Sequence, residues 1–393
     1  MKYISITTTI FTTLFSVIQA QSSTVNILTA TVNTNNNNVP TVSSTFSTPG
    51  KLTETYPASG SIPTAKPEWL ELIKNQNITN APVLKSNGDD GPSTDGVDNY
   101  CNWSKSGCLG DSISDCPKGI WGLTYDDGPS DVSPILYDFL KTTNQKATLF
   151  MIGANVVKYP EIVKRAFDEG HELAIHTWSH NFMTTLTNEQ IVAELKWTEL
   201  AIKEVTGFSP RFFRPPYGDI DNRVRDIATA LGFKSVIWDH DTNDWMLGEN
   251  APGFKAEWID GNFTEWIAEA ATATTGGLSL EHDIQKVTVD AAIKNLPGLQ
   301  KAYKVVTVGE CAGLSSYKEG NVTKPVNTTT SAISSSTMAS STLSISTTSS
   351  ATHTEQKQKP SELSSAANHI LVHTSLSAFL VSIVAFGLTF CLI

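Results

Sequence analysis

Residues 119–130 read GIWGLTYDDGPS, a short apolar run that ends in two adjacent aspartates on a Gly-Pro turn. The run is too short for a helix and is bounded by turn residues, so it predicts a strand over Gly119–Tyr125, directly followed by Asp126 and Asp127. Two neighbouring carboxylates repel each other unless a cation or a proton separates their roles. An acidic turn that caps the next helix is the alternative explanation of this motif.

The same kind of run recurs along residues 101–311, which are long enough for one sizeable domain. Six further strands are predicted at Ala147–Met151, His171–Ile175, Arg211–Arg214, Lys234–Trp238, Leu278–Leu280 and Lys304–Val308. Helical patterns fit between most of them, starting at Ser133, at Pro160 and at a Thr187–Gln190 capping box, with others over Asn222–Leu231, Phe263–Thr274 and Val287–Leu296. About seven strands alternating with helices predict an α/β fold with a parallel sheet, either a barrel or an open sheet.

In such folds, functional residues gather beyond the carboxyl ends of the strands. The third predicted strand is followed by His176-Thr177-Trp178-Ser179-His180, and histidines four residues apart can share one face of a helical turn. One aspartate and two histidines are a ligand set that catalytic zinc sites use while they leave a position open for water. We therefore assign Asp127, His176 and His180 to a divalent metal ion and Asp126 to the role of general base.

Three more strand ends carry polar motifs. Arg214 opens a stiff Pro-Pro loop and can pair with Asp126, while the backbone N–H of Tyr217 in that loop can face a developing oxyanion. His282 follows the sixth predicted strand and is the natural general acid, since an amine leaving group must be protonated. Asp244, after the fifth strand, can orient that imidazole.

Five polar clusters at five strand ends resemble the ordered motifs of the polysaccharide deacetylases of carbohydrate esterase family 4. The match runs from Thr124 to His282, and the resemblance extends over about Cys101–Cys311. It implies a distorted (β/α)7-type barrel and gives Asp126, Asp127, His176, His180, Arg214, Tyr217, Asp244 and His282 the roles named above.

The resemblance also places Trp245 and Leu280 as walls of the acetyl pocket. Two positions depart from the family pattern: Tyr125 replaces the commoner Phe, and Glu281 stands beside the general acid where an apolar residue is frequent. Because a carboxyl group next to an imidazole can alter its pKa, the second departure bears directly on His282.

The implied function is hydrolysis of the N-acetyl groups of chitin, which gives chitosan and acetate during cell-wall remodelling, with one Zn²⁺ or Co²⁺ ion as cofactor. Deacetylation of peptidoglycan and de-esterification of acetylated xylan are the alternatives among enzymes. A catalytically silent chitin-binding wall protein is the alternative from another class. We expect a monomer.

The ends of the chain are typical of a secreted, lipid-anchored protein. Residues 1–20 read as a signal peptide, and residues 366–393 as a glycosylphosphatidylinositol (GPI) signal that is removed, although an ordinary membrane span is the alternative. The lipid would join Ser364, Ser365 or Ala366. Residues 21–100, rich in Ser, Thr and Asn at their start, are a possible pro-segment in this scheme, and residues 312–365 form an O-glycosylated stalk.

Cysteines and charge agree with that route. Four cysteines remain once Cys391 leaves with the tail, and of three possible pairings we predict Cys116–Cys311 and Cys101–Cys108. N-glycosylation sequons begin at Asn77, Asn102, Asn262, Asn321 and Asn327. The net charge of −11 and the lack of a Lys/Arg-rich run argue against a nucleic-acid partner. The sequence thus predicts an enzyme at the cell wall and the outer face of the plasma membrane.

Overall fold

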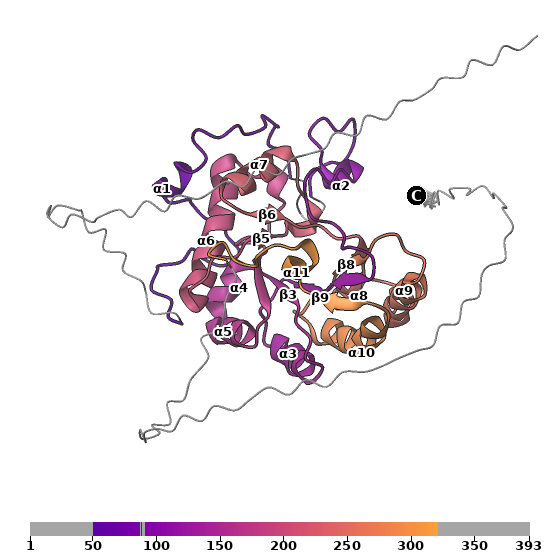
Figure 1. Cartoon of the computed structure of the whole chain (residues 1–393). Coiled ribbons are helices and arrows are strands. Elements are labelled where there is room, and N and C mark those ends of the chain that lie inside the picture. Colours follow the sequence, from indigo (N-terminus) through magenta and orange to yellow (C-terminus); the bar gives the residue numbers. More distant parts are fainter. Residues whose placement is uncertain (1–49, 87, 89–90, 321–393) are drawn as a thin grey trace, which may run out of the picture. The chain divides into compact units, whose positions relative to one another are not determined.

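The computed structural model of the chain describes residues 50–86, 88 and 91–320 (Figure 1). The predicted signal peptide, residues 321–365 of the predicted stalk, the anchor signal and the sequons at Asn321 and Asn327 lie outside these residues. The predicted start of the stalk at residue 312 is wrong, because Tyr317 is buried and forms a bridge with Pro210 of the barrel domain. No helix in the described part is both long enough and apolar enough to cross a membrane.

Short parallel strands form the centre of the fold. Their bounds are β1 (Ile120–Gly122), β2 (Thr124–Asp126), β3 (Thr148–Met151), β4 (Glu172–Ile175), β5 (Phe212–Phe213), β6 (Lys234–Ser235), β7 (His240–Asp241), β8 (Gly277–Leu280) and β9 (Lys304–Val306). They make two sheets, with the orders β2-β3-β4-β5-β6 and β7-β8-β1-β9. Each of the seven predicted strands overlaps at least one of them, and only the two-residue β7 was not predicted.

Two runs of chain belong to both sheets and join them into a distorted barrel. Only Leu123 separates β1 from β2, and residues 236–239 connect β6 to β7, so each run leaves one sheet and enters the other. Beyond β8, His282 forms a parallel bridge with Asp126 at the end of β2. The predicted parallel α/β fold is therefore confirmed, and its barrel form follows from these two shared runs.

Helices surround the barrel in an arc whose neighbours touch in the order α7, α6, α4 with α5, α3, α10 and α9 (Figure 1). The helix bounds are α3 (Ser133–Thr142), α4 (Gly153–Lys158), α5 (Pro160–Asp168), α6 (Asn188–Thr206), α7 (Asn222–Ala230), α8 (Asp244–Gly248), α9 (Ala256–Glu269), α10 (Lys286–Ala302) and α11 (Val308–Ala312). Two 3-10 turns, η2 (Met183–Thr185) and η3 (Pro216–Gly218), lie in loops at the strand ends.

Most helix starts agree with the sequence signals. The capping box at Thr187 and Gln190 opens α6. Helix α9 begins at Ala256, earlier than predicted, because Ile259 and Phe263 are four residues apart and bury the same face. Helix α10 continues through Pro297 to Ala302, although the prediction ended it at Leu296; the buried Leu299 keeps the last turns packed.

Strand residues alternate between the barrel interior and the helices. Phe150, Ala174, Phe212, Val236, Leu278 and Val306 come from different strand runs and form one buried apolar cluster. Their neighbours along the chain, such as Leu149, Leu173 and Phe213, belong to the larger cluster that includes the helices. Because successive side chains of a strand point to opposite faces, each strand contributes both to the barrel interior and to the layer between the barrel and the helices.

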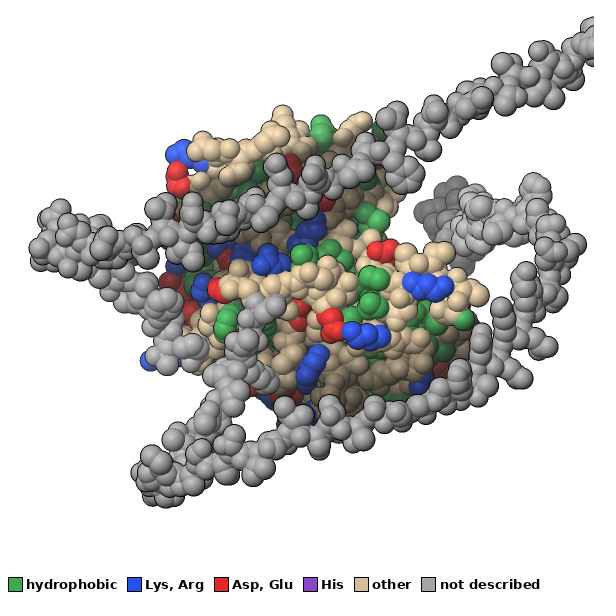
Figure 2. All heavy atoms as spheres, in the orientation of Figure 1, with side chains coloured by type: hydrophobic (Ala, Val, Ile, Leu, Met, Phe, Trp, Pro, Cys, Tyr) green, Lys and Arg blue, Asp and Glu red, His purple; other side chains and the backbone are tan. Residues whose placement is uncertain are grey.

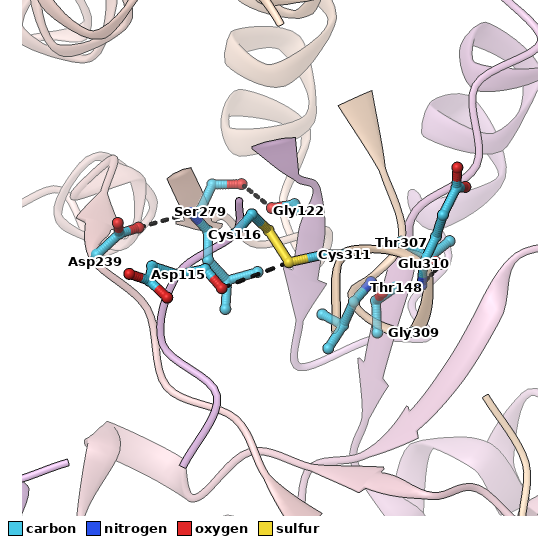
Figure 3. Close-up of a disulfide and its surroundings, with 12 residues drawn as sticks. Asp115, Cys116, Gly122, Thr148, Asp239, Ser279, Thr307, Gly309, Glu310 and Cys311 are labelled. Atoms are coloured by element: carbon cyan, nitrogen blue, oxygen red, sulfur yellow. Dashed lines mark hydrogen bonds between the residues drawn. A yellow bond between two sulfur atoms is a disulfide. The ribbon is translucent and has the colours of Figure 1, made fainter. Parts of the chain in front are cut away.

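Both predicted disulfides are present. Cys116, just before β1, is bonded to Cys311 in α11, with Sγ of Cys311 3.5 Å from the carbonyl oxygen of Asp115 (Figure 3). The bond ties together the two ends of the barrel sequence, 195 residues apart. Cys101 and Cys108, 7 residues apart in sequence, close a local loop.

The described residues of 50–100 lie against α6, α7 and η2, and we call them the N-terminal strap. The strap includes the short helix α1 (Pro67–Leu70), and helix α2 (Trp103–Ser106) follows it. Tyr56 stacks on Trp178 with ring centroids 5.8 Å apart and donates a hydrogen bond of 2.9 Å to Glu204. Folded structure therefore extends before residue 101, because the strap packs on aromatic rings of the barrel domain and bonds to one of its carboxylates.

Candidate active site

The predicted site residues come together at one end of the barrel. Asp126 ends β2, His176 follows β4, Arg214 follows β5, Asp244 begins α8 after β7, and His282 lies two residues beyond β8. Parallel strands direct their carboxyl ends to the same side, so loops that are far apart in sequence meet there.

Three of these side chains share one point in space. Oδ1 of Asp127 lies 3.2 Å from Nε2 of His176 and 3.1 Å from Nε2 of His180. Ligands about 2.1 Å from a tetrahedral ion stand roughly 3.4 Å from each other, close to these separations. Oδ1 of Asp127 is also buried without a hydrogen-bond partner. An orphaned carboxylate oxygen between two imidazole nitrogens fits a divalent cation.

Hydrogen bonds on the far side of each imidazole orient the pair. Nδ1 of His176 lies 2.9 Å from the carbonyl oxygen of Arg214, which can only accept, so Nδ1 carries the proton and Nε2 offers its lone pair. Nδ1 of His180 lies 3.2 Å from the hydroxyl of Tyr217. Burial alone would raise the pKa of Asp127, but the two imidazoles outweigh it and hold that pKa well below its usual range.

Asp126 lies beside this triad rather than in it. Its Oδ2 is 3.9 Å from Nε2 of His176, and its Oδ1 accepts a hydrogen bond of 2.8 Å from Nη1 of Arg214. The same Nη1 donates to the Thr124 hydroxyl at 2.7 Å, and the guanidinium stands 4.3 Å from the centre of the Phe150 ring. Arg214 is fully buried, and these contacts fix the position of its guanidinium. They also fix the position of the Asp126 carboxylate that Arg214 binds.

His282 and Asp244 form a second pair on the other side of the triad. Nδ1 of His282 lies 2.7 Å from Oδ1 of Asp244, and the His282 backbone N–H donates to Oδ2 at 2.9 Å. Burial alone would lower the pKa of His282, but Asp244, helped by Asp127 and Asp126, raises it to about 10. A cation in the triad would oppose this rise, because it repels the imidazole proton.

Glu281, which departs from the family pattern, is buried and accepts a hydrogen bond of 3.0 Å from the Ser279 hydroxyl. Burial, together with the charge of Asp244, raises the pKa of its carboxyl to about 8. The charges that raise the pKa of His282 are those of Asp244, Asp127 and Asp126. His282 therefore keeps the partner that a general acid needs.

The remaining predicted residues border the same space. Tyr217 lies in η3 with half of its side chain exposed, and Trp245 follows Asp244 in α8 with 41% exposed. Leu280 ends β8 and is buried. The oxyanion role of Tyr217 and the acetyl-pocket role of Trp245 and Leu280 stay predictions.

Several loop residues around the site adopt the left-handed backbone conformation, which is costly for residues other than glycine. Their φ angles are 74° for Asp127, 62° for Thr177, 59° for His180, 58° for Tyr217 and 57° for Asn243. Such positions collect at functional sites, where surrounding contacts impose them. No sequence signal indicated them.

Two buried carboxylates that the sequence analysis missed hold the loops in place. Glu194 of α6 accepts hydrogen bonds from the backbone N–H groups of Trp178 and Ser179, at 2.7 and 2.9 Å, and so fixes the turn between the two histidines. Asp219 accepts from the backbone N–H and the hydroxyl of Thr184. A charged residue inside the apolar run 191–195 was the available signal for Glu194.

The described sequon asparagines differ in their surroundings. Asn77 is exposed. Asn102 is buried, and its side chain caps α2 by accepting from the backbone N–H of Lys105. Asn262 lies within α9, and its Nδ2 donates to the carbonyl oxygens of Asp241 and Thr242. A glycan on Nδ2 of Asn262 would disturb both bonds, which favours Asn77 among these three.

Comparison with known proteins gives one family. Residues 114–236 match the family described as polysaccharide deacetylase. A chitin deacetylase of Amylomyces rouxii is 40% identical over 267 residues, which are 63% of this chain and 62% of that protein. Chitin deacetylase 1 of Saccharomyces cerevisiae is 38% identical over 222 residues, 56% of this chain and 69% of the yeast protein.

Among solved structures, the chitin deacetylase of the fungal pathogen Colletotrichum lindemuthianum is similar, with 29% identity and a TM-score of 0.48. That match covers 55% of this chain and 98% of the Colletotrichum chain. This chain spans less than two thirds of the length of the Amylomyces rouxii relative.

Proposed function

This chain belongs to the polysaccharide deacetylase family, and we propose that it removes N-acetyl groups from the N-acetylglucosamine residues of chitin to give chitosan and acetate. One observation carries the proposal. The Asp127, His176 and His180 ligand atoms all lie within 4.8 Å of one another, with the Asp126–Arg214 pair and the His282–Asp244 pair beside them. A site with a cation triad, a base and an acid has every group that amide hydrolysis requires.

Asp127, His176 and His180 would hold one divalent ion, Zn²⁺ or Co²⁺, which supplies Lewis-acid polarisation of the acetamide carbonyl and lowers the pKa of a nearby water. Asp126 takes a proton from the attacking water, and Arg214 keeps the carboxylate of Asp126 turned toward the triad. The water oxygen adds to the carbonyl carbon, the C–N bond breaks, and His282 gives its proton to the departing glucosamine nitrogen. Acetate is the second product.

The other residues position these groups. Asp244 holds the imidazole of His282 through Nδ1, which leaves Nε2 to carry the transferred proton. The backbone N–H of Tyr217 donates to the oxyanion, and Trp245 with Leu280 surrounds the acetyl methyl group.

Two observations favour chitin over peptidoglycan and acetylated xylan. Both sequence relatives reported above are named chitin deacetylases. The predicted stalk and GPI anchor are typical of a eukaryotic wall protein. Over the face shown in Figure 2, acidic and basic side chains are interspersed, without a large patch of one charge. A silent binding protein has no need for Asp126 and His282, which are both in place.

Two disulfides fit a secreted protein. We place the enzyme at the cell wall and the outer face of the plasma membrane, held through a lipid at Ser364, Ser365 or Ala366.

The test is acetate release from chitin oligomers, peptidoglycan and acetylated xylan, measured side by side. We expect the highest kcat/KM on chitin oligomers and loss of activity after chelation of the metal. Equal rates on all three substrates would contradict the substrate assignment. Chitin binding without acetate release would favour the silent binding protein.

A further inference from the structure

The turn that carries the two histidine ligands has a strained backbone. Thr177 and His180 have φ angles of 62° and 59°, and such angles persist in residues other than glycine only where surrounding contacts impose them. Glu194 supplies part of that support through the backbone N–H groups of Trp178 and Ser179. The N-terminal strap supplies another part, because it contacts the chain on both sides of His180.

The first contact joins the strap to Trp178, which lies between the two histidines and is 1% exposed. Tyr56 of the strap stacks on the indole ring, with the two planes at 6°. The indole N–H donates to the carbonyl oxygen of Ala58 at 3.4 Å. Helix α4 closes another side of the ring, since a Cβ on Gly153 would lie 2.6 Å from Cε3 of Trp178. The indole is therefore enclosed between the strap and the barrel domain.

Tyr56 is itself held in place on α6. Its hydroxyl donates to Oε2 of Glu204 at 2.9 Å, and the backbone N–H of Thr53 donates to the same oxygen at 2.8 Å. The ring of Tyr56 also meets Trp197 edge to face, with centroids 5.8 Å apart. A ring that is bonded through its hydroxyl and packed on two indoles has one position, so it limits the movement of Trp178.

The second contact lies on the other side of His180. A Cβ on Gly91 would lie 2.5 Å from Cε1 of Phe182, so the strap backbone rests directly on that ring. Phe182 stacks on Tyr217, with ring centroids 4.0 Å apart and planes at 15°. The Tyr217 hydroxyl lies 3.2 Å from Nδ1 of His180. The strap thus reaches this ligand by two routes, one through Trp178 and one through Phe182 and Tyr217.

We propose that the N-terminal strap is part of the metal site, and that Tyr56 is a positioning residue that acts through Trp178 on the turn between His176 and His180. This inference rests on the proposed function, in which both histidines bind a divalent ion. It has a consequence for processing of the chain. A strap that supports ion binding stays in the active protein, in contrast to the possible role of residues 21–100 as a pro-segment.

The test measures the Kd for Zn²⁺ by calorimetry in wild type, Tyr56→Ala and Tyr56→Phe. We expect Tyr56→Ala to bind the ion about tenfold more weakly, as outer-shell changes do. Tyr56→Phe keeps the stacked ring, so its Kd should stay near that of wild type. Equal Kd values in wild type and Tyr56→Ala would overturn the proposal.

Trp69→Ala is the matched control. Trp69 is another ring of the strap that packs on Trp197, with centroids 4.9 Å apart, and in the described part of the chain no ring contact joins it to Trp178. The same loss of Zn²⁺ affinity in Trp69→Ala as in Tyr56→Ala would overturn the role of Tyr56. Urea denaturation checks that each variant is folded. If Tyr56→Ala does not fold, Tyr56→Leu, which keeps an apolar side chain without a flat ring, takes its place in the comparison.

Two further measurements separate this proposal from the proposed function. If wild type binds Zn²⁺ but releases no acetate, the deacetylase assignment fails, while weaker Zn²⁺ binding by Tyr56→Ala still supports the positioning role. Mass spectrometry of the active secreted protein should find peptides that include Tyr56. An active protein whose chain begins after residue 100 would overturn the proposal.

Discussion

Two charged pairs flank the metal triad, and they are built in opposite ways. Asp126 is an anion held by a cation, Arg214, whose guanidinium is fully buried. His282 is held by an anion, Asp244, and its own side chain keeps 12% exposure. The first arrangement fixes a carboxylate that accepts a proton, and the second raises the pKa of an imidazole that donates one. The surroundings of Asp126 and His282, rather than their residue types alone, therefore suit the first to act as base and the second as acid.

The largest expected effect comes from removing the base. Asp126→Asn keeps the size of the side chain but loses the proton acceptor, so we expect acetate release to fall by about 10³-fold while metal binding persists. The matched control is Asp131→Asn, which changes an exposed aspartate a few residues further along the chain. Comparable activity in wild type and Asp126→Asn would remove Asp126 from the base role.

The acid pair is tested by a shift in pH dependence. Asp244 raises the pKa of His282, so Asp244→Asn lowers it and His282 loses its proton at lower pH. The alkaline limb of the kcat/KM profile therefore moves to lower pH, with a rate loss of about 10²-fold at neutral pH. A rate loss without movement of that limb would mean that Asp244 acts only on the geometry of the loop.

A smaller effect is expected from changing Glu194, which supports the turn between His176 and His180. Glu194→Gln removes the negative charge and the oxygen that accepts from the Ser179 hydroxyl, and keeps one oxygen for the backbone N–H groups of Trp178 and Ser179. We expect metal affinity to weaken about tenfold, as outer-shell changes do. Glu189→Gln, an exposed change on the same helix, is the control. Calorimetric titration with the metal measures the Kd of both variants. Equal Kd values would show that the turn between His176 and His180 keeps its conformation without the Glu194 carboxylate.

The smallest expected effect on catalysis is at Glu281, where stability changes instead. Burial raises its pKa from the ordinary value of 4.5 to about 8, so the stability that the protonated carboxyl contributes is complete below 4.5 and is lost as pH rises to 8. Each pKa unit is worth about 1.4 kcal/mol, which makes the loss on the order of a few kcal/mol.

Glu281→Gln should flatten this fall in the free energy of unfolding between pH 5 and pH 8, as measured by urea denaturation. Glu249→Gln, an exposed control, should keep the wild-type slope. If the free energy of unfolding of Glu281→Gln fell with pH as steeply as that of wild type, the pH dependence would come from other buried carboxyl groups.

The sequence predicted the strand runs and the meeting of Asp126, Arg214 and His282, because parallel strands bring their carboxyl ends together. It did not predict the left-handed backbone of Asp127 and His180, since neither residue is a glycine and the Gly-Pro turn after Asp127 does not by itself set the φ angle of that aspartate. The packing of the strap was also missed, because its partners, Trp178 and Trp197, lie far away in sequence.

The central claim is that one divalent ion bound by Asp127, His176 and His180 is required for acetate release. Elemental analysis and acetate release, measured together on wild type and His176→Ala, test it most directly. The account predicts one ion per chain with activity in wild type, and loss of both the ion and activity in His176→Ala. Acetate release at the wild-type rate from metal-free protein would contradict it.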